Sequence, residues 1–195
     1  MHGVSCNMRL YVVRHGESET NQQKRWTGWL DVHLTEKGKA DAQKASEFLK
    51  GVSFDKIYTS DLSRAMETAE IAIPDCRYEK TPLLREINVG SLAGQPASVL
   101  SDDQRKHTAV NGYADFGGET KEAVYKRILQ FRKELETRND KTVAVFTHAG
   151  WMCGLLDTVV EEQLQRKHIC CDNCAVAVFE FRNEVWRLHS WINFT

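Results

Sequence analysis

The stretch LYVVRHGESETN, residues 10–21, begins with a run of β-branched and aromatic residues and ends in glycine and polar residues. A short apolar run of this kind predicts a buried β-strand over Arg9 to Val13, which enters a loop at Arg14 and His15. Two cationic side chains therefore stand where the strand ends. In an open α/β sheet ligands bind beyond the carboxyl ends of the strands, so both residues are candidates for a functional site.

The same pattern occurs twice more in the chain. Strands are predicted at Asp55 to Thr59, followed by a helix that starts within Ser60-Asp-Leu-Ser-Arg-Ala65, and at Thr142 to Phe146, followed by Thr147-His-Ala-Gly150 and a helix over Trp151 to Val160. This alternation predicts an α/β fold, a mostly parallel central sheet with helices on both faces. Arg64 and His148 would then lie at the same sheet edge as Arg14 and His15.

The remaining elements complete a three-layer α/β/α sandwich, which we expect to be one domain over residues 1–195. A helix is predicted from the N-cap Thr35 to about Lys50, and another over Glu119 to Arg138. The apolar stripe of the second helix is predicted at Ala123, Ile128, Phe131 and Leu135. Two further strands are predicted at Ala175 to Phe181 and Trp186 to Trp191.

Composition limits the classes of partner. The chain has 195 residues, 42% of them hydrophobic, which is enough for one core, and its formal net charge of -1 provides no basic face for nucleic acid or acidic lipid. No apolar run approaches the ~18 residues of a membrane span, and the first residues lack the apolar region of a secretory signal. We therefore expect a cytoplasmic protein without nucleic-acid or membrane partners. A homodimer stays an open alternative.

Cysteine usage predicts neither a disulfide framework nor a metal centre. A domain of this length does not need disulfides, so the six cysteines are expected to be free thiols. The cluster Cys170-Cys171-Asp172-Asn173-Cys174 lacks the paired spacing of a zinc ribbon and precedes a predicted strand. We predict no metal and no cofactor.

The residues at the predicted sheet edge suit an anion. Two arginines can bind the oxygens of a phosphoryl group, and helix N-termini add N–H donors and a positive dipole end. A neutral histidine can attack phosphorus if a backbone carbonyl holds one ring nitrogen as N–H and leaves the other as a lone pair. A single Arg-His pair at a strand end is more often only a surface pair, so the case depends on the whole set of motifs.

That set resembles the histidine phosphatase superfamily, in the branch of the cofactor-dependent phosphoglycerate mutases and fructose-2,6-bisphosphatases. The resemblance is carried by Arg-His-Gly-Glu with Asn21, by the segment WTGWLDVHLTEKG at 26–38, by Ser60 to Ala65 and by Thr147-His-Ala-Gly150. It is dense over 10–73 and 142–154 and thin over 96–116. It implies the sandwich fold and phosphoryl-transfer chemistry.

The resemblance also implies roles for single residues. His15 would be the nucleophile that becomes phosphohistidine, and Glu86 would be the general acid that protonates the leaving alcohol. The residues implied to contact the phosphate or substrate are Arg14, Asn21, Thr27, Gly28, Arg64 and His148. Glu86 has the least local motif support, and its alternative is a solvated surface acid, while Glu17 stays unassigned.

Hydrolysis and mutase activity remain the two enzymatic alternatives. The mutases follow their acidic glutamate with a His-Tyr pair and bind a carboxylate with further basic residues, whereas here Ile87-Asn88-Val89 follows Glu86. The segment 96–116 is short, and its only basic residues are Arg105, Lys106 and His107. We therefore expect a metal-independent phosphomonoesterase acting on a small phosphate ester. The alternatives are a bisphosphoglycerate-dependent phosphoglycerate mutase and a module that binds phosphorylated ligands without turnover.

Overall fold

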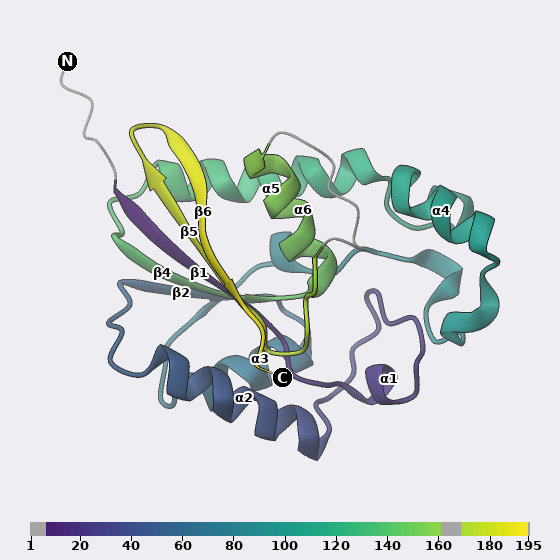
Figure 1. The fold of residues 1–195 in the computed structure, drawn as a ribbon, viewed down its shortest axis with the longest axis horizontal. Helices are drawn as coiled ribbons and strands as arrows, with labels where there is room; N and C mark the ends of the chain where they lie inside the picture. The colour runs from purple at the N-terminus through teal and green to yellow at the C-terminus, as the bar shows by residue number, and fades with distance from the viewer. Residues whose placement is uncertain (1–6, 161–168, 195) are drawn as a thin grey trace.

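The computed structural model describes residues 7–160 and 169–194, so Cys6 and the outermost residues of the predicted domain lie outside the described part. Its centre is a six-stranded sheet of order β3-β2-β4-β1-β5-β6 (Figure 1). The strands are β1 (Met8–Arg14), β2 (Lys56–Thr59), β3 (Glu79–Lys80), β4 (Thr142–Thr147), β5 (Val176–Arg182) and β6 (Val185–Ile192). The first four in chain order run parallel, and β5 and β6 are antiparallel additions. The prediction of a mostly parallel sheet is confirmed.

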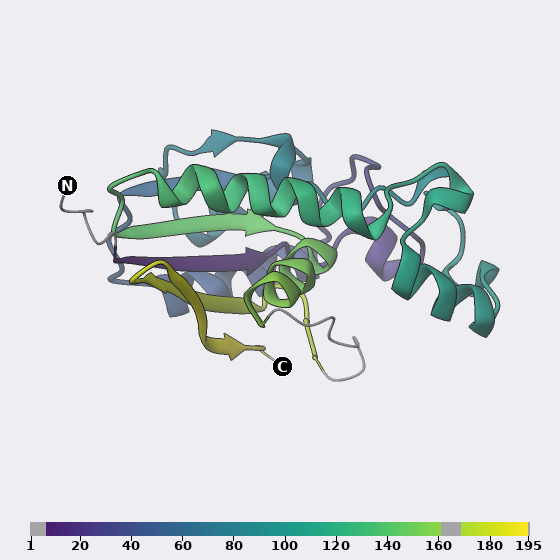
Figure 2. The same ribbon diagram turned by 90° about the horizontal axis from the view of Figure 1, so that it is seen from above.

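Helices cover both faces of the sheet. The helices are α1 (Glu19–Gln22), α2 (Glu36–Leu49), α3 (Ser63–Ala72), α4 (Asp102–Asn111), α5 (Lys121–Glu136) and α6 (Ala149–Val160). One face is packed by α2 and α3 and the other by α5 and α6, while α4 lies beyond the end of the sheet (Figures 1 and 2). Among the described residues no helix is both long and apolar enough to cross a bilayer. The three-layer α/β sandwich is confirmed.

Helix boundaries follow from local capping. Thr35 caps α2 by accepting a hydrogen bond from the Gly38 N–H at 3.0 Å, as predicted. Thr120 caps α5 in the same way, accepting from Ala123 N–H at 3.0 Å. The predicted stripe of α5 was wrong at Ala123, which is exposed, and Val124 is buried instead. Position 124 shares a face with 128, 131 and 135 because they are spaced by four, three and four residues, whereas 123 lies five residues before 128.

The two central strands lie in the dry core. Val12 of β1 and Val145 of β4 are 0% exposed. On the α5–α6 side they pack in a cluster that includes Phe131 and Trp151, and on the other side Val13 and Phe146 pack with the alanines of α2 and α3. Burial on both faces explains why these strands read as continuous apolar runs.

Candidate active site

The carboxyl ends of three parallel strands place the site. Arg14 at the end of β1 is in register with Thr147 at the end of β4, and Thr59 at the end of β2 pairs with Phe146. The next residues of the three strands, His15, Ser60 and His148, consequently emerge at one edge. Backbone bonds hold them there: His15 N–H donates to Thr147 O and Ser60 N–H to Phe146 O, both at 2.9 Å.

A cavity of about 180 Å³ opens at this edge. Its wall contains seven of the eight predicted site residues, namely Arg14, His15, Asn21, Thr27, Gly28, Arg64 and Glu86. The eighth, His148, is fully buried with its ring centroid 5.1 Å from that of His15. Residues far apart in the sequence are thus brought together around one small space.

His15 has the tautomer that nucleophilic attack requires. Its Nδ1 lies 2.6 Å from the carbonyl oxygen of Gly16, to which it can only donate, so Nε2 carries the lone pair. The side chain is 4% exposed. Burial, reinforced by the charges of Arg64 and Arg14, holds the His15 pKa well below its usual 6.5. The imidazole is therefore neutral at physiological pH.

His148 is neutral for similar reasons. Burial is the largest cause that lowers its pKa well below 6.5, followed by the charge of Arg64. Its Nε2 lies 2.9 Å from the Ser60 hydroxyl, whereas its buried Nδ1 has no partner among the described protein atoms. Ser60 was missed by the sequence reasoning, although it follows β2 directly and the strand-end rule would have found it.

The two arginines are held by backbone carbonyls. Arg64 is 0% exposed and donates to Leu30 O at 2.8 Å and to Gly28 O at 2.9 Å. Burial lowers the Arg64 pKa to about 10, which still leaves a cation at neutral pH. Arg14 donates from Nη1 to Cys171 O. Part of each guanidinium group is thus bonded to the protein, and both Nε atoms are buried without a partner among the described protein atoms.

One N–H group at the start of each of two helices at this edge binds a carboxylate of the protein. Ser63 N–H at the start of α3 donates to the Asp31 carboxylate at 2.7 Å, and Gly150 N–H at the start of α6 donates to Glu86 Oε2 at 3.2 Å. These N–H groups satisfy the protein's own carboxylates. These two N–H groups are therefore engaged within the protein, while Arg14 and Arg64 place positive charge at the cavity.

Glu86 is partly buried and lines the cavity. Its Oε1 accepts from the Ile87 N–H at 2.9 Å, and its Oε2 from Gly150 as above. Gly150 leaves room for this carboxylate, because a Cβ there would lie 2.2 Å from Oε1. The loop of Glu86 is thus packed directly against the start of α6. Glu17, unassigned before, accepts from the Thr35 hydroxyl at 2.9 Å and supports the cap of α2.

Asn21, Thr27 and Gly28 also line the cavity. Asn21 Oδ1 accepts from Ser18 N–H at 3.2 Å and from Asn173 Nδ2 at 3.3 Å. The Thr27 and Thr20 hydroxyls are 2.6 Å apart. Gly28 has φ +52°, and a Cβ there would meet Val89 Cγ2 at 2.7 Å, so the tight approach requires glycine.

Asn173 was missed as a site residue. Sequence reasoning considered it only within the cysteine cluster, but its Nδ2 donates to the backbone oxygen of His15 at 3.2 Å as well as to Asn21. The Cys174 N–H donates to the same His15 oxygen at 3.2 Å. The turn before β5 therefore braces the loop that carries His15. None of the five cysteines in the described part of the chain forms a disulfide, and Cys174 is fully buried.

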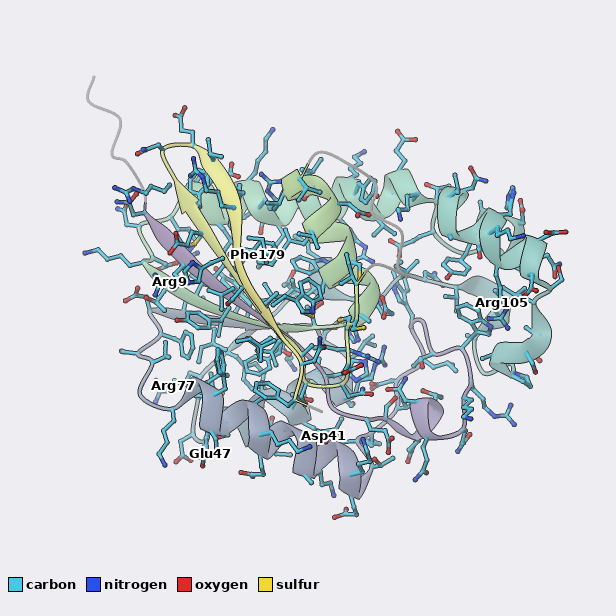
Figure 3. All side chains as sticks on the ribbon, viewed as in Figure 1. Arg9, Asp41, Glu47, Arg77, Arg105 and Phe179 are labelled. Atoms are coloured by element: carbon cyan, nitrogen blue, oxygen red, sulfur yellow. The ribbon has the colours of Figure 1, made fainter. Side chains whose placement is uncertain are left out.

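Arg25, Trp26 and Tyr113 line the cavity but were not among the eight predicted site residues. Tyr113 comes from the segment 96–116 with little family resemblance, whereas Arg25 and Trp26 come from the region 10–73 where the resemblance is dense. Arg25 Nη1 donates to Gly94 O at 2.7 Å, and the rings of Trp26 and Tyr113 meet edge to face at 5.7 Å. Arg105, by contrast, lies on α4 away from the sheet and donates to Ala97 O (Figure 3).

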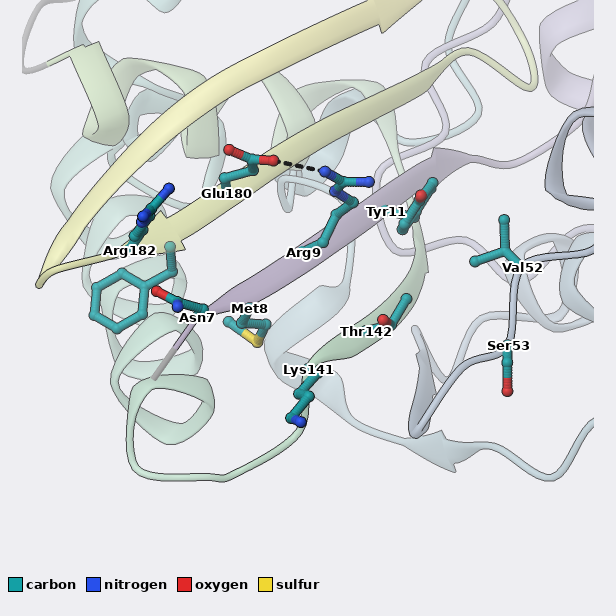
Figure 4. A pocket seen from close by; sticks show the side chains of 11 residues that line it. Asn7, Met8, Arg9, Tyr11, Val52, Ser53, Lys141, Thr142, Glu180 and Arg182 are labelled. Atoms are coloured by element: carbon teal, nitrogen blue, oxygen red, sulfur yellow. Dashed lines mark hydrogen bonds and ion pairs between the residues drawn. The ribbon is translucent and has the colours of Figure 1, made fainter. Parts of the chain in front are cut away.

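A larger cavity, about 580 Å³, lies at the opposite end of the sheet, where β1 and β4 begin (Figure 4). Its charged residues include Arg9 and Glu180, which pair at 2.8 Å. It has no histidine in its wall and no strand carboxyl ends from parallel strands. Among the described residues no group of three or more histidine, cysteine or acidic side chains could hold a metal ion. The histidine-lined cavity is the better candidate for chemistry.

An α/β sheet with two neutral histidines and two arginines beyond its strand ends defines a protein of the phosphoryl-transfer class. The chain belongs to the histidine phosphatase superfamily (branch 1), whose family model matches residues 10–193. It is thus a member of a superfamily of enzymes that includes phosphatases and phosphoglycerate mutases.

Individual relatives cover the chain to different extents. It is 46% identical over 93 residues to a 2,3-bisphosphoglycerate-dependent phosphoglycerate mutase of Elusimicrobium minutum, a match to 44% of this chain and only 38% of that protein. It is 27% identical over 194 residues, 95% of this chain and 90% of the relative, to the probable phosphoglycerate mutase GpmB of Cronobacter sakazakii. The crystal structure of an Entamoeba histolytica phosphoserine phosphatase in complex with 3-phosphoglyceric acid superposes with a TM-score of 0.82 at 26% identity, covering 96% of this chain and 98% of that one.

Proposed function

We propose that this protein is a metal-independent phosphomonoesterase that hydrolyses a small phosphorylated metabolite through a phosphohistidine on His15. The observation that carries the proposal is the His15 imidazole itself, with Nδ1 bonded to Gly16 O and a depressed pKa. A neutral ring with a free Nε2 in a cavity that also contains Arg14, Arg64 and Glu86 has the groups for in-line displacement.

In the first half-reaction the Nε2 lone pair of His15 forms a bond to phosphorus as the bond from phosphorus to the ester oxygen breaks. The protonated Glu86 carboxyl gives its proton to the departing oxygen, so an alcohol leaves. The guanidinium charges of Arg14 and Arg64 stabilise the transferring group. His148, 5.1 Å from His15 between ring centroids, can donate a further hydrogen bond to it.

In the second half-reaction water attacks the phosphohistidine. The Glu86 carboxylate takes a proton from that water, the bond between phosphorus and Nε2 breaks, and inorganic phosphate leaves. Glu86 is again protonated and His15 again neutral. The cycle needs no metal ion and no redox partner.

Hydrolysis is favoured over mutase activity by the composition of the cavity wall. After Glu86 the wall continues with the apolar Ile87 and Val89. Arg105, Lys106 and His107 do not line it, and Arg25, which does, already donates from Nη1 to Gly94 O at 2.7 Å. A substrate carboxylate would therefore lack the basic residues of the segment 96–116. Phosphoglycerate mutase activity is the second candidate, because a probable phosphoglycerate mutase matches 95% of the chain.

The test is a panel of phosphomonoesters, including O-phosphoserine, 3-phosphoglycerate and sugar phosphates, assayed for phosphate release in EDTA. The proposal predicts release from at least one ester without added metal. A mutase assay with 3-phosphoglycerate and 2,3-bisphosphoglycerate runs in parallel. Interconversion of phosphoglycerates much faster than phosphate release would replace hydrolysis by the mutase assignment, and binding without turnover of any ester would reject both.

A further inference from the structure

A buried ion pair outside the cavity contacts the backbone around Glu86. It joins Arg127 of α5 to Glu119, two residues before that helix, with Nε and Oε1 2.9 Å apart. The side chains are only 11% and 14% exposed. An ion pair that is largely removed from solvent is weak evidence for stability, because desolvation offsets the attraction between the charges. The hydrogen bonds that the pair makes to the backbone therefore say more about its role than its contribution to stability does.

Arg127 binds three carbonyl groups on the loop of Glu86. Its Nη1 donates to Leu83 O at 3.0 Å and to Arg85 O at 2.7 Å, and its Nη2 donates to Glu86 O at 3.0 Å. The planar guanidinium can reach these acceptors at once because its donors point in fixed directions. Only arginine among the side chains offers this geometry.

Glu119 binds the other side of the same loop. Its Oε2 accepts from the Asn88 N–H at 2.7 Å, and its backbone N–H donates to Asn88 O at 2.8 Å. Arg127 Nη2 also donates to Glu119 Oε2 at 3.1 Å. The pair consequently fixes the backbone both before and after Glu86.

The loop has no regular secondary structure, although Arg85 donates to the Asp61 carboxylate at 2.7 and 2.6 Å and Val89 is buried. Residues 85–89 belong to neither helix nor strand, so no ladder of backbone bonds places them. The Glu86 carboxylate itself is bonded to its neighbour Ile87 and, at 3.2 Å, to Gly150. Outside the pair, Trp29 Nε1 donates to Glu86 O at 2.7 Å from the solvent side. The direction of the carboxyl thus depends on where the backbone is held.

We propose that the Arg127–Glu119 pair is the positioning device for the Glu86 carboxyl, and that it acts on the step in which the leaving oxygen is protonated. This inference depends on the proposed function, since it needs Glu86 to be the general acid. A misplacement of about 1 Å in a catalytic group costs on the order of 10²-fold in rate. The loss of rate should appear only with substrates whose leaving oxygen must be protonated by Glu86.

The test compares Arg127→Lys with Arg132→Lys. Lysine keeps the charge beside Glu119 but cannot donate to three carbonyls in one plane. Arg132 is the matched control, because it lies on the same helix, is 16% exposed, and donates to Thr158 O at 3.0 Å instead of to the loop of Glu86. Each variant is assayed with benzyl phosphate, whose alcohol needs a proton, and with p-nitrophenyl phosphate, which has a similar shape and a leaving group that departs unaided.

Arg127→Lys should lower kcat/KM for benzyl phosphate by roughly 10- to 10²-fold and leave p-nitrophenyl phosphate near the wild-type value. Adding Glu86→Gln should cause little further loss, because both changes remove the same proton transfer. Arg132→Lys should lower neither rate selectively, whatever its effect on thermal stability. An equal loss on both esters in Arg127→Lys, or the same selective loss in Arg132→Lys, would overturn the positioning role.

The underlying function is tested separately by Glu86→Gln alone. If that variant loses activity equally on the two esters, Glu86 is not the acid, and both the mechanism and the positioning role are rejected. If Glu86→Gln is selective and Arg127→Lys is not, only the positioning role is rejected.

Discussion

Gly150 is the position at which one added methyl group tests the geometry of Glu86 most directly. In Gly150→Ala the new Cβ would lie 2.2 Å from Glu86 Oε1 and 2.8 Å from Ile87 Cδ1, whereas ordinary contact begins at 3.4 Å. The carboxylate must therefore withdraw by roughly 1 Å. Displacement of a catalytic group by that distance costs about 10²-fold, so kcat/KM for benzyl phosphate should fall by about that factor.

The assay pairs benzyl phosphate with p-nitrophenyl phosphate, for which the loss should be small. Gly154→Ala is the control, since it adds the same methyl group on the same helix but meets Ile128 Cδ1, the end of a flexible core side chain, at 2.7 Å. Replacing a helical glycine by alanine also favours the helix by ~1 kcal/mol in both variants. Equal losses on the two esters, or a selective loss in Gly154→Ala, would refute the reasoning.

Three further changes probe the other groups. His15→Ala should abolish turnover and prevent the trapping of an acid-labile, base-stable phosphoenzyme, and a phosphoenzyme that persists in the variant would contradict the assignment. Arg64→Lys should weaken inhibition by vanadate, because two bonds to backbone carbonyls and a guanidinium are lost, while wild-type affinity in a titration would argue against phosphate contact. The pKa values of His15 and His148 are lowered in the folded protein, so the unfolded chain binds more protons than the folded one below pH 6.5. The free energy of unfolding should therefore be greatest above that pH and decline as the pH falls. Urea unfolding of wild type and His148→Gln at several pH values will check this.

The grouping of the residues that follow the strands could be predicted from the sequence, because the carboxyl ends of parallel strands lie at a common edge of the sheet. That rule alone gathers His15, Arg64 and His148, each of which follows a short apolar run by a few residues. It also accounts for Ser60, which we overlooked. The prediction at Ala123 was wrong by one position, because a spacing of about 3.6 residues per turn places Val124 on the face of Ile128.

Contacts made through loops could not be predicted in this way. Tyr113 and Trp26 line the cavity because of the conformation of the loops that carry them. That conformation includes left-handed glycines such as Gly28, whose positions no periodic pattern predicts. Asn173 reaches the backbone of His15 across 158 residues of sequence, and no periodic pattern marks a bond between a side chain and a distant backbone oxygen. The same is true of the bonds from Arg127 to the loop of Glu86.

The position of β4 in the sheet has a consequence for how a nascent chain acquires activity. β1 pairs with β4 and β5, and β2 pairs with β3 and β4, so the strands that precede His15 and Arg64 have no backbone bonds to each other. At the ~5–20 residues per second of synthesis, both strands leave the ribosome seconds before Thr142 begins to join them. Until then each presents an unpaired edge of the kind that promotes association between chains. A ribosome-bound chain stalled before Thr142 should accordingly be inactive and depend on chaperones, although it already contains His15, Arg64 and Glu86.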